Sequence, residues 1–396
     1  MKKSWMKKIA FTAGALALSL GVVGLKANAA ETGSTTEPTS GVYITKTLIT
    51  PDTDVADIPT MTFQFAAHDG KYYPFTSEGK QNATADSTVT VPGIPGKSIS
   101  FTHDEMATDS TSTDGTATLT KFSSDLLAGV KYTQVGVYEY VISENDAVDE
   151  EADLPEGGTV TYDSTTYTLR VWVTNDGNGS FIVTPTLVDS EGNKLGEGVN
   201  GFTFTNKYSV ENTNIVDPTD PTNPDTGADF WVKKLVAGDA ADINKDFTYT
   251  MTIPENELTK DKTYTLMFTN PVATEVTVEP GTPVTYTLKH NQIAYIKSIT
   301  PGAQVTVAET DDADYDEANK AIFNGNEKLT TDADYEPLKA TGTLGSAANN
   351  VTYTNTHKGA EVTPTGILMN NLPYVALIVI GGLGLGFYVM NKRRNA

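Results

Sequence analysis

A lysine, a glutamate and an asparagine occur in the same order in each half of this chain. They are Lys46, Glu144 and Asn206 in the first half, and Lys233 or Lys234, Glu309 and Asn355 in the second. If such a triplet meets away from water, a neutral lysine amine can attack the asparagine carboxamide and expel ammonia. Burial lowers a lysine pKa and raises a glutamate pKa, so the glutamic acid could polarise the carboxamide. The product is an intramolecular isopeptide bond.

The positions of these residues in apolar strands favour burial. Residues two apart share one face of a strand, so Lys46 lies on the face of Ile44 and Leu48. The glutamates and asparagines also share a face with apolar neighbours. In the second half, Lys234 shares a face with Val232 and Val236, and Lys233 shares the other face with apolar residues too. Parity therefore does not choose between these two lysines.

Two interpretations without a covalent bond compete with the cross-link. The triplet could be a buried Lys–Glu ion pair beside a hydrogen-bonded asparagine, or the side chains could reach solvent at the strand ends. An isolated buried charge is costly, so each group needs a partner. The recurrence of the same triplet in both halves favours the cross-link.

The elements that must position these residues are β-strands. Short runs rich in Thr, Val, Tyr and Phe alternate polar with apolar residues, and residues 175–179 (Asn-Asp-Gly-Asn-Gly) between two such runs are typical of a hairpin turn. No amphipathic helix of convincing length is present. The sequence predicts an all-β protein with two tandem β-sandwich domains.

The chain divides into six segments. Basic lysines, an apolar run and an Ala-x-Ala site predict a secretory signal peptide over residues 1–29, rather than a retained anchor. Residues 30–41 read as a flexible lead. The first β domain is expected over 42–208, a Pro-rich linker over 209–228, the second β domain over 229–358, and a terminal signal over 359–396.

The terminal signal has three parts. It begins with the short motif Val362-Thr363-Pro364-Thr365-Gly366, continues with an apolar run over 372–390 long enough to span a bilayer, and ends in the basic residues 392–394. A plain membrane anchor is one interpretation. The segment also resembles the cell-wall sorting signals of Gram-positive surface proteins, which implies cleavage by a sortase between Thr365 and Gly366. Its proline stands third, unlike the common Leu-Pro-x-Thr-Gly form.

Composition argues against several functions. Eight of the 28 basic residues lie at the two ends, before residue 30 or after residue 391, and all 50 acidic residues lie between residues 30 and 361. The exported part is therefore strongly acidic and unsuited to nucleic acid. The chain has no cysteine and no familiar catalytic motif, and its four histidines are far apart. We expect no cofactor and no metal, because the acidic run Asp311–Glu317 lacks the glycine of a calcium loop.

Several short stretches, taken in their order along the chain, resemble the major (backbone) pilins of group A streptococci. The matching stretches are residues 44–46, 136–144, 160–168, 204–206, 232–234, 309, 353–355 and 364–366. The resemblance implies two Ig-like (Cna-B-like) domains, each with a Lys–Asn isopeptide bond promoted by a glutamate. It pairs Lys46 with Asn206 and Glu144. It pairs Lys234, with Lys233 as second choice, with Asn355 and Glu309.

The same resemblance implies polymerisation. A pilus sortase would join the Thr365 carboxyl of one subunit to a lysine of the next identical subunit. Lys194 is our candidate acceptor, with Lys207 and Lys131 as alternatives. The implied function is the major shaft subunit of a cell-wall-anchored pilus, with accessory pilins and host surface ligands as further partners. The alternatives are a wall-anchored monomeric adhesin or an accessory (tip or base) pilin; a secreted enzyme is disfavoured.

Overall fold

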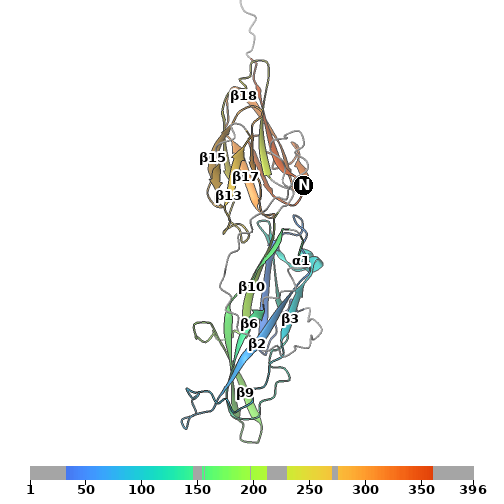
Figure 1. Cartoon of the computed structure of the whole chain (residues 1–396). Helices are drawn as coiled ribbons and strands as arrows, with labels where there is room; N and C mark the ends of the chain where they lie inside the picture. Colours follow the sequence, from blue (N-terminus) through green and yellow to red (C-terminus); the bar gives the residue numbers. More distant parts are fainter. Residues whose placement is uncertain are drawn as a thin grey trace, which may run out of the picture.

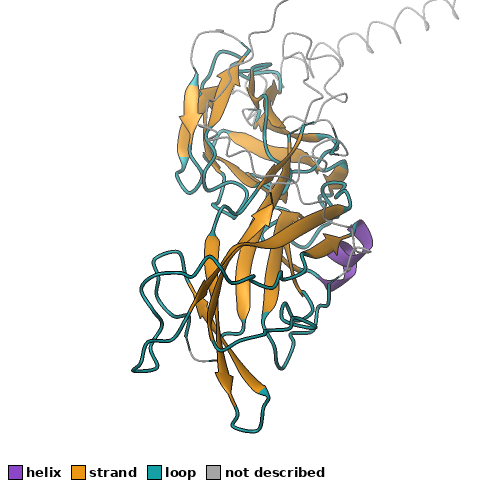
Figure 2. Ribbon diagram, turned by 60° about the horizontal axis from the view of Figure 1, so that its bottom comes forward, coloured by secondary structure: helices purple, strands orange, loops and turns teal. Residues whose placement is uncertain are grey.

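A computed structural model of the chain describes residues 33–145, 154–155, 157–196, 198–211, 230–269 and 275–359. Within these ranges strands dominate, as Figure 2 shows, and one short helix interrupts them. This confirms the predicted all-β class. Among the described residues, none lies in a helix long and apolar enough to cross a membrane.

The first half of the described chain forms two facing sheets around one core. Their strand orders are β4-β5-β1-β10-β7 and β3-β2-β6-β8-β9. The elements are β1 (Tyr43–Pro51), β2 (Met61–Tyr73), β3 (Lys97–Phe101), α1 (His103–Asp109), β4 (Thr111–Thr113), β5 (Thr116–Phe122), β6 (Gly136–Asn145), β7 (Gly158–Thr161), β8 (Thr166–Asn175), β9 (Phe181–Val188) and β10 (Gly201–Val210).

The second half repeats this plan with its own core. Its sheets have the orders β14-β13-β16-β11-β21-β18-β19 and β15-β12-β17-β20. The strands are β11 (Phe230–Ala237), β12 (Phe247–Thr252), β13 (Tyr264–Phe268), β14 (Val276–Val278), β15 (Val284–Leu288), β16 (Ile293–Ile296), β17 (Gln304–Glu309), β18 (Tyr315–Phe323), β19 (Asn326–Lys328), β20 (Lys339–Thr343) and β21 (Asn349–His357).

Alternation along the strands explains the two cores. In β10, Phe202, Phe204 and Tyr208 point inward and are fully buried, while Thr203, Thr205 and Lys207 are more exposed. Asn206 occupies an inward position of the same series and is also fully buried. The polar residues singled out by parity therefore lie inside the sandwich, where a polar group needs a partner.

The first and last strands of each half are parallel neighbours. β1 pairs with β10 so that Leu48 lies opposite Asn206, and β11 pairs with β21 so that Val236 lies opposite Asn355. In each half, the residue opposite the asparagine lies two positions after the lysine on the same strand. Lysine and asparagine thus share the inner face of adjacent strands.

Three local features differ from the sequence prediction. The helix α1 was not predicted; Thr102 caps it, and Thr102 and Glu105 form a capping box. The lead was expected to be flexible, but Ser34 exchanges two backbone hydrogen bonds with Phe122 at the end of β5. The linker was expected from residue 209, but β10 continues to Val210 and pairs there with β7.

The two halves meet end to end, as Figure 1 shows. Lys207 forms an ion pair of 3.0 Å with Glu257, and the Asn256 side chain donates to the backbone oxygens of Asp114 and Gly302, both at 3.0 Å. Gly115, at φ 80°, lies so close that a Cβ there would collide with the Gly302 carbonyl. Only glycine combines this approach with positive φ at low cost.

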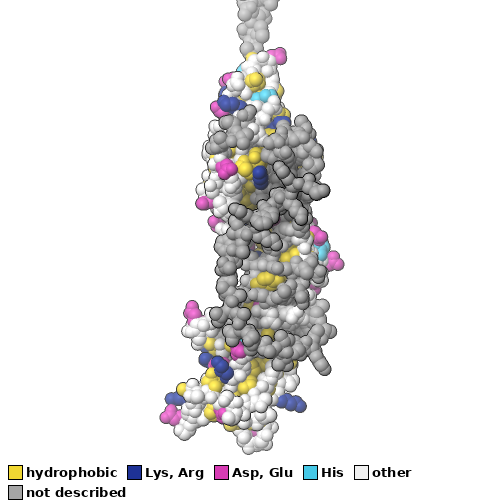
Figure 3. Space-filling view, viewed as in Figure 1, with side chains coloured by type: hydrophobic (Ala, Val, Ile, Leu, Met, Phe, Trp, Pro, Cys, Tyr) yellow, Lys and Arg dark blue, Asp and Glu magenta, His cyan; other side chains and the backbone are white. Residues whose placement is uncertain are grey.

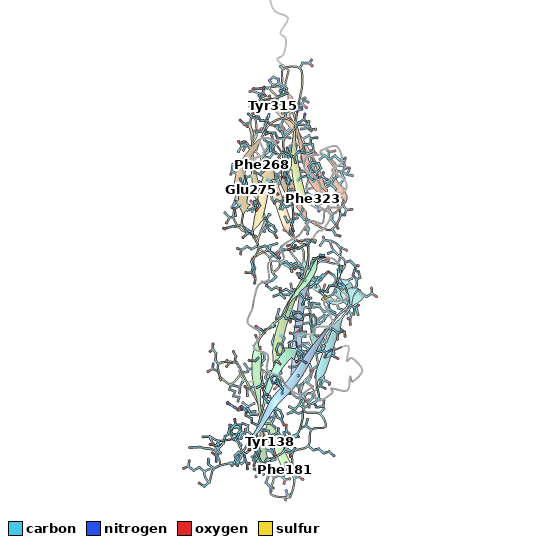
Figure 4. All side chains as sticks on the ribbon, viewed as in Figure 1. Tyr138, Phe181, Phe268, Glu275, Tyr315 and Phe323 are labelled. Carbon is cyan, nitrogen blue, oxygen red and sulfur yellow. The ribbon has the colours of Figure 1, made fainter. Side chains whose placement is uncertain are left out.

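The described part of the molecule is elongated, and β9 and β18 mark its two ends. Phe181, at the start of β9, and Tyr315, at the start of β18, lie at opposite ends in Figure 4. The last strand ends beside Tyr315, which pairs with His357. On the face in Figure 3, basic and acidic side chains are scattered among the described residues and form no broad basic patch.

Candidate functional site

The first site lies between the two sheets of the first half. Lys46 on β1 and Asn206 on β10 come from one sheet, and Glu144 near the end of β6 reaches them from the facing sheet. Lys46 Nζ donates to Glu144 Oε2 at 2.7 Å, and Asn206 Nδ2 donates to Glu144 Oε1 at 2.6 Å. The side chains of Lys46 and Glu144 are completely buried. The structure therefore brings the first predicted triplet together.

The second site has the same construction. Lys234 on β11 and Asn355 on β21 share one sheet, and Glu309 ends β17 in the facing sheet. Lys234 Nζ and Asn355 Nδ2 donate to Glu309 Oε1 at 2.5 Å and 2.6 Å. Lys234 is fully buried and Lys233 is not. The structure thus places Lys234, rather than Lys233, against the glutamate.

Aromatic rings that the sequence analysis missed enclose both lysines. Lys46 Nζ lies 4.6 Å from the ring centre of Phe63 and 5.8 Å from that of Phe65. Lys234 Nζ lies 4.0 Å from Phe247 and 5.9 Å from Tyr249. These rings exclude water, and their faces attract a cation. The repeated pattern of an aromatic, any residue and a second aromatic on the strand after each lysine could have indicated them.

Burial shifts the protonation equilibria at both sites. It raises the pKa of Glu144 and of Glu309, although the lysine and asparagine partners of each glutamate oppose the shift. Burial lowers the pKa of Lys234 to about 8, against the opposing charge of Glu309. Each shift favours the neutral form of the group. A neutral amine and a neutral carboxylic acid are the forms needed for amide formation.

A third buried lysine lacks the complete triplet. Lys121 on β5 forms a 2.6 Å ion pair with Glu105 of α1 and also donates to the Ser100 carbonyl at 2.7 Å. Hydrogen bonds from Lys121 and Thr102 hold the pKa of Glu105 below its ordinary value, although burial opposes them. This ion pair joins α1 to the sheet. It has the lysine and glutamate of the other sites but no asparagine among these partners.

The proposed acceptor lysines occupy different settings. Lys194 is exposed and follows a turn in which Asp189 accepts hydrogen bonds from Glu191 and Asn193. Lys131 is exposed as well. Lys207 instead lies at the junction of the two halves, paired with Glu257. Of the three, Lys207 is therefore the least available to a second subunit.

The remaining predicted residues cannot be placed. Val362, Thr363, Pro364, Thr365 and Gly366 lie outside the described residues. In the acidic run Asp311–Glu317, Asp312 forms a 2.5 Å ion pair with Lys245.

Two domain families match the two sandwiches. Residues 42–209 match the Spy0128-like isopeptide containing domain, and residues 228–357 match a domain of unknown function (DUF7601). The first match coincides with the sandwich that holds the Lys46 site. The first half of the chain is therefore similar to the Spy0128-like isopeptide containing domain.

The chain resembles streptococcal pilins over most of its length. A curated pilin of Streptococcus pyogenes serotype M1 is 26% identical over 329 residues, which cover 78% of this chain and 83% of that pilin. Together with the isopeptide-domain match, this supports a pilus subunit.

Two solved major pilins of S. pyogenes are also similar. One (T3.2) is 20% identical and covers 80% of this chain and 97% of its own, with a TM-score of 0.32. The other is 19% identical and covers 80% and 99%, with a TM-score of 0.33.

Proposed function

We propose that this protein is the major shaft subunit of a sortase-polymerised pilus anchored to a Gram-positive cell wall, and that each sandwich closes its own Lys–Asn isopeptide bond. The observation that carries the proposal is the repeated site. Twice, a buried lysine on the first strand and a buried asparagine on the last strand contact one buried glutamate from the facing sheet.

The position of the two sites suits a subunit under tension. In a shaft, force enters and leaves each domain through its terminal strands, and β1–β10 and β11–β21 are these strands. They are parallel neighbours, so force along the axis would shear their hydrogen bonds. A covalent bond between them would carry the load instead.

The chemistry uses only the side chains of each site. Proton transfer from the lysine to the glutamate yields a neutral amine and a carboxylic acid. The amine nitrogen attacks the asparagine Cγ, and the carboxamide C=O electron pair moves to oxygen. The glutamate passes a proton to the departing nitrogen and takes one from the attacking nitrogen. The electron pair on oxygen re-forms the C=O bond, the C–N bond breaks, and ammonia leaves. The product is a neutral amide, which removes two charges from the core. Each chain reacts once at each site, so the protein is not an enzyme.

Closure of the second bond should depend on pH in a specific direction. The pair of Lys234 and Glu309 must hold one proton for the glutamate to act as an acid. Because the pKa of Lys234 is lowered to about 8, the pair loses this proton as pH rises through that value. We expect the closure rate to be flat near neutrality and to fall about tenfold for each pH unit above about 8. A rate that keeps rising above that pH would contradict the proposed role of Glu309.

Closure can be followed from the unlinked chain. Residues 30–361 purified in denaturant are refolded at each pH, quenched in acid and digested. The linked peptide containing Lys234 and Asn355 is then quantified by mass spectrometry.

Polymerisation distinguishes the shaft from the alternatives. The curated relative is a pilin and the solved relatives are major pilins, whereas other similar structures are pilus-presented adhesins. Lys194 is exposed on the first half, while the chain leaves the second half at its far end. This arrangement suits head-to-tail joining of the Thr365 carboxyl to Lys194 of the next identical subunit by a pilus sortase.

The full chain, expressed in a Gram-positive host with a pilus sortase, should give a ladder of covalent multimers on denaturing gels. Lys194→Arg should abolish the ladder and leave monomer on the wall, while Lys131→Arg serves as the matched control. A ladder that persists in Lys194→Arg would exclude this acceptor. Absence of a ladder from the wild-type chain would favour a monomeric adhesin or an accessory pilin.

A further inference from the structure

The first site contains a hydrogen bond that has no counterpart at the second among the described residues. The backbone N–H of Asp163, in the connection between β7 and β8, donates to Asn206 Oδ1 at 2.8 Å. We infer that this N–H stabilises the oxyanion formed on Asn206 during closure, so that the two bonds of the chain form by differently assisted routes. This inference rests on the proposed function.

The N–H fixes the orientation of the Asn206 carboxamide. A backbone N–H can only donate, so the side-chain atom that it meets must be the carbonyl oxygen. The amide nitrogen then faces Glu144, 2.6 Å from Oε1. The sequence predicts that the glutamate polarises the carbonyl. At this site Glu144 instead contacts the nitrogen that leaves, where it can supply the departing proton.

The carbonyl is thereby activated from the opposite side. When Lys46 Nζ attacks Cγ, the C=O electron pair moves to Oδ1, and the Asp163 N–H lies where that negative charge develops. A fixed backbone donor in a buried site needs no reorganisation as the charge appears, which is why such donors accelerate acyl transfer. Collapse of the intermediate restores the C=O bond and expels the nitrogen, which leaves as ammonia with the proton from Glu144.

The carboxylate of Asp163 holds this N–H in place. Its Oδ2 accepts from the backbone N–H of Thr205, the residue before Asn206, at 2.8 Å, and its Oδ1 accepts from the backbone N–H of Thr165 at 2.9 Å. These hydrogen bonds keep the pKa of Asp163 low, although burial opposes them. Asp163 is therefore a positioning residue through its side chain and a contributor to the reaction through its backbone.

The second site differs because β18, the strand beside β21, stays in the sheet past Asn355. In the first half, the β7–β10 ladder ends where Thr161 pairs with Lys207, and the chain then crosses toward β8 beside Asn206. In the second half, β18 runs past the site, pairing Glu317 with Asn355 and continuing to Ile322. Among the described residues, Asn355 Oδ1 has no hydrogen-bond partner. Closure there therefore relies on Glu309 without a counterpart of the Asp163 N–H among the described residues.

The test removes the donor atom while keeping the fold. Residue 163 is replaced by the α-hydroxy analogue of aspartate during in vitro translation, which exchanges the N–H for an ester oxygen and retains the side chain. The protein of residues 30–361 is refolded from denaturant, and the linked peptides of both sites are quantified over time. We expect the Lys46–Asn206 rate to fall about 10²-fold, with the Lys234–Asn355 rate unchanged as an internal control.

Side-chain variants provide a second line that does not depend on the ester. Asp163→Ala removes the carboxylate that accepts from the N–H groups of Thr205 and Thr165. It should slow closure at the first site about tenfold, because the Asp163 N–H is then held less firmly. Asp163→Asn retains an acceptor for the Thr205 N–H and should close at nearly the wild-type rate. If Asp163→Ala were slow because of a folding defect, this recovery would not be expected. Trp172 fluorescence reports folding of the first half.

The outcomes separate this inference from the function on which it rests. An ester variant that closes the first site at the wild-type rate overturns the role of the N–H, while both bonds still form. A wild-type protein that folds but closes neither site overturns the isopeptide proposal itself, and this inference with it. Equal rates for Asp163→Ala and the wild type overturn the positioning role of the carboxylate.

Discussion

Asn206→Ala should lower the melting temperature of the first half by about 10–20 °C. The cross-link joins residues 46 and 206 and so closes a loop of more than one hundred residues, for which chain-entropy arguments on disulfides give about 5 kcal/mol. In a domain of this size, each kcal/mol corresponds to about 2–4 °C. Trp172 reports the first half, and a Trp231→Phe background removes the signal of the second.

The second half offers the matched control. Asn355→Ala should shift the transition of its own half and leave that of the first nearly unchanged, because the two bonds lie in separate cores. The reporter in that experiment is Trp231 in a Trp172→Phe background. If Asn206→Ala unfolds at the wild-type temperature, the proposed bond does not brace the first half.

Glu144→Gln should slow closure of the first bond by about 10²–10⁴-fold, the range for loss of a proton-transferring group. Glutamine has nearly the shape of glutamate and can still accept a hydrogen bond from Lys46, but it cannot take and return a proton. Refolded samples are digested, and the linked peptides are quantified over time. Closure at Lys234–Asn355 in the same molecules should proceed at the wild-type rate.

Glu309→Gln is the reciprocal experiment and should affect only the second bond. A Gln variant with normal closure at its own site would show that the glutamate serves packing rather than proton transfer. A variant that slows both sites equally would indicate a folding defect, which Trp172 and Trp231 fluorescence would reveal.

Much of the fold could be predicted because strand alternation is a local signal. The inward positions of Lys46, Glu144 and Asn206 followed from parity with their apolar neighbours, and the structure confirms that they are buried. Parity could not choose between Lys233 and Lys234, because both faces of that strand carry apolar residues. The choice depends on which face meets β17, and this is a property of the assembled sandwich.

Other features depend on contacts distant in the sequence. The donor at Asp163 lies 43 residues from Asn206, in a connection with no distinctive composition. The helix α1 is too short to show a periodic pattern, although Thr102 and Glu105 have capping-box spacing. The lead looked flexible by composition, yet it is held at Ser34 by backbone hydrogen bonds to Phe122, which composition cannot reveal.

The intact mass of the wild-type protein of residues 30–361 tests the central claim most directly. The account predicts a mass lower than the sequence mass by two molecules of ammonia, with one linked peptide joining Lys46 to Asn206 and another joining Lys234 to Asn355. A folded protein with the full sequence mass would contradict it. The two sites would then be buried ion pairs beside hydrogen-bonded asparagines.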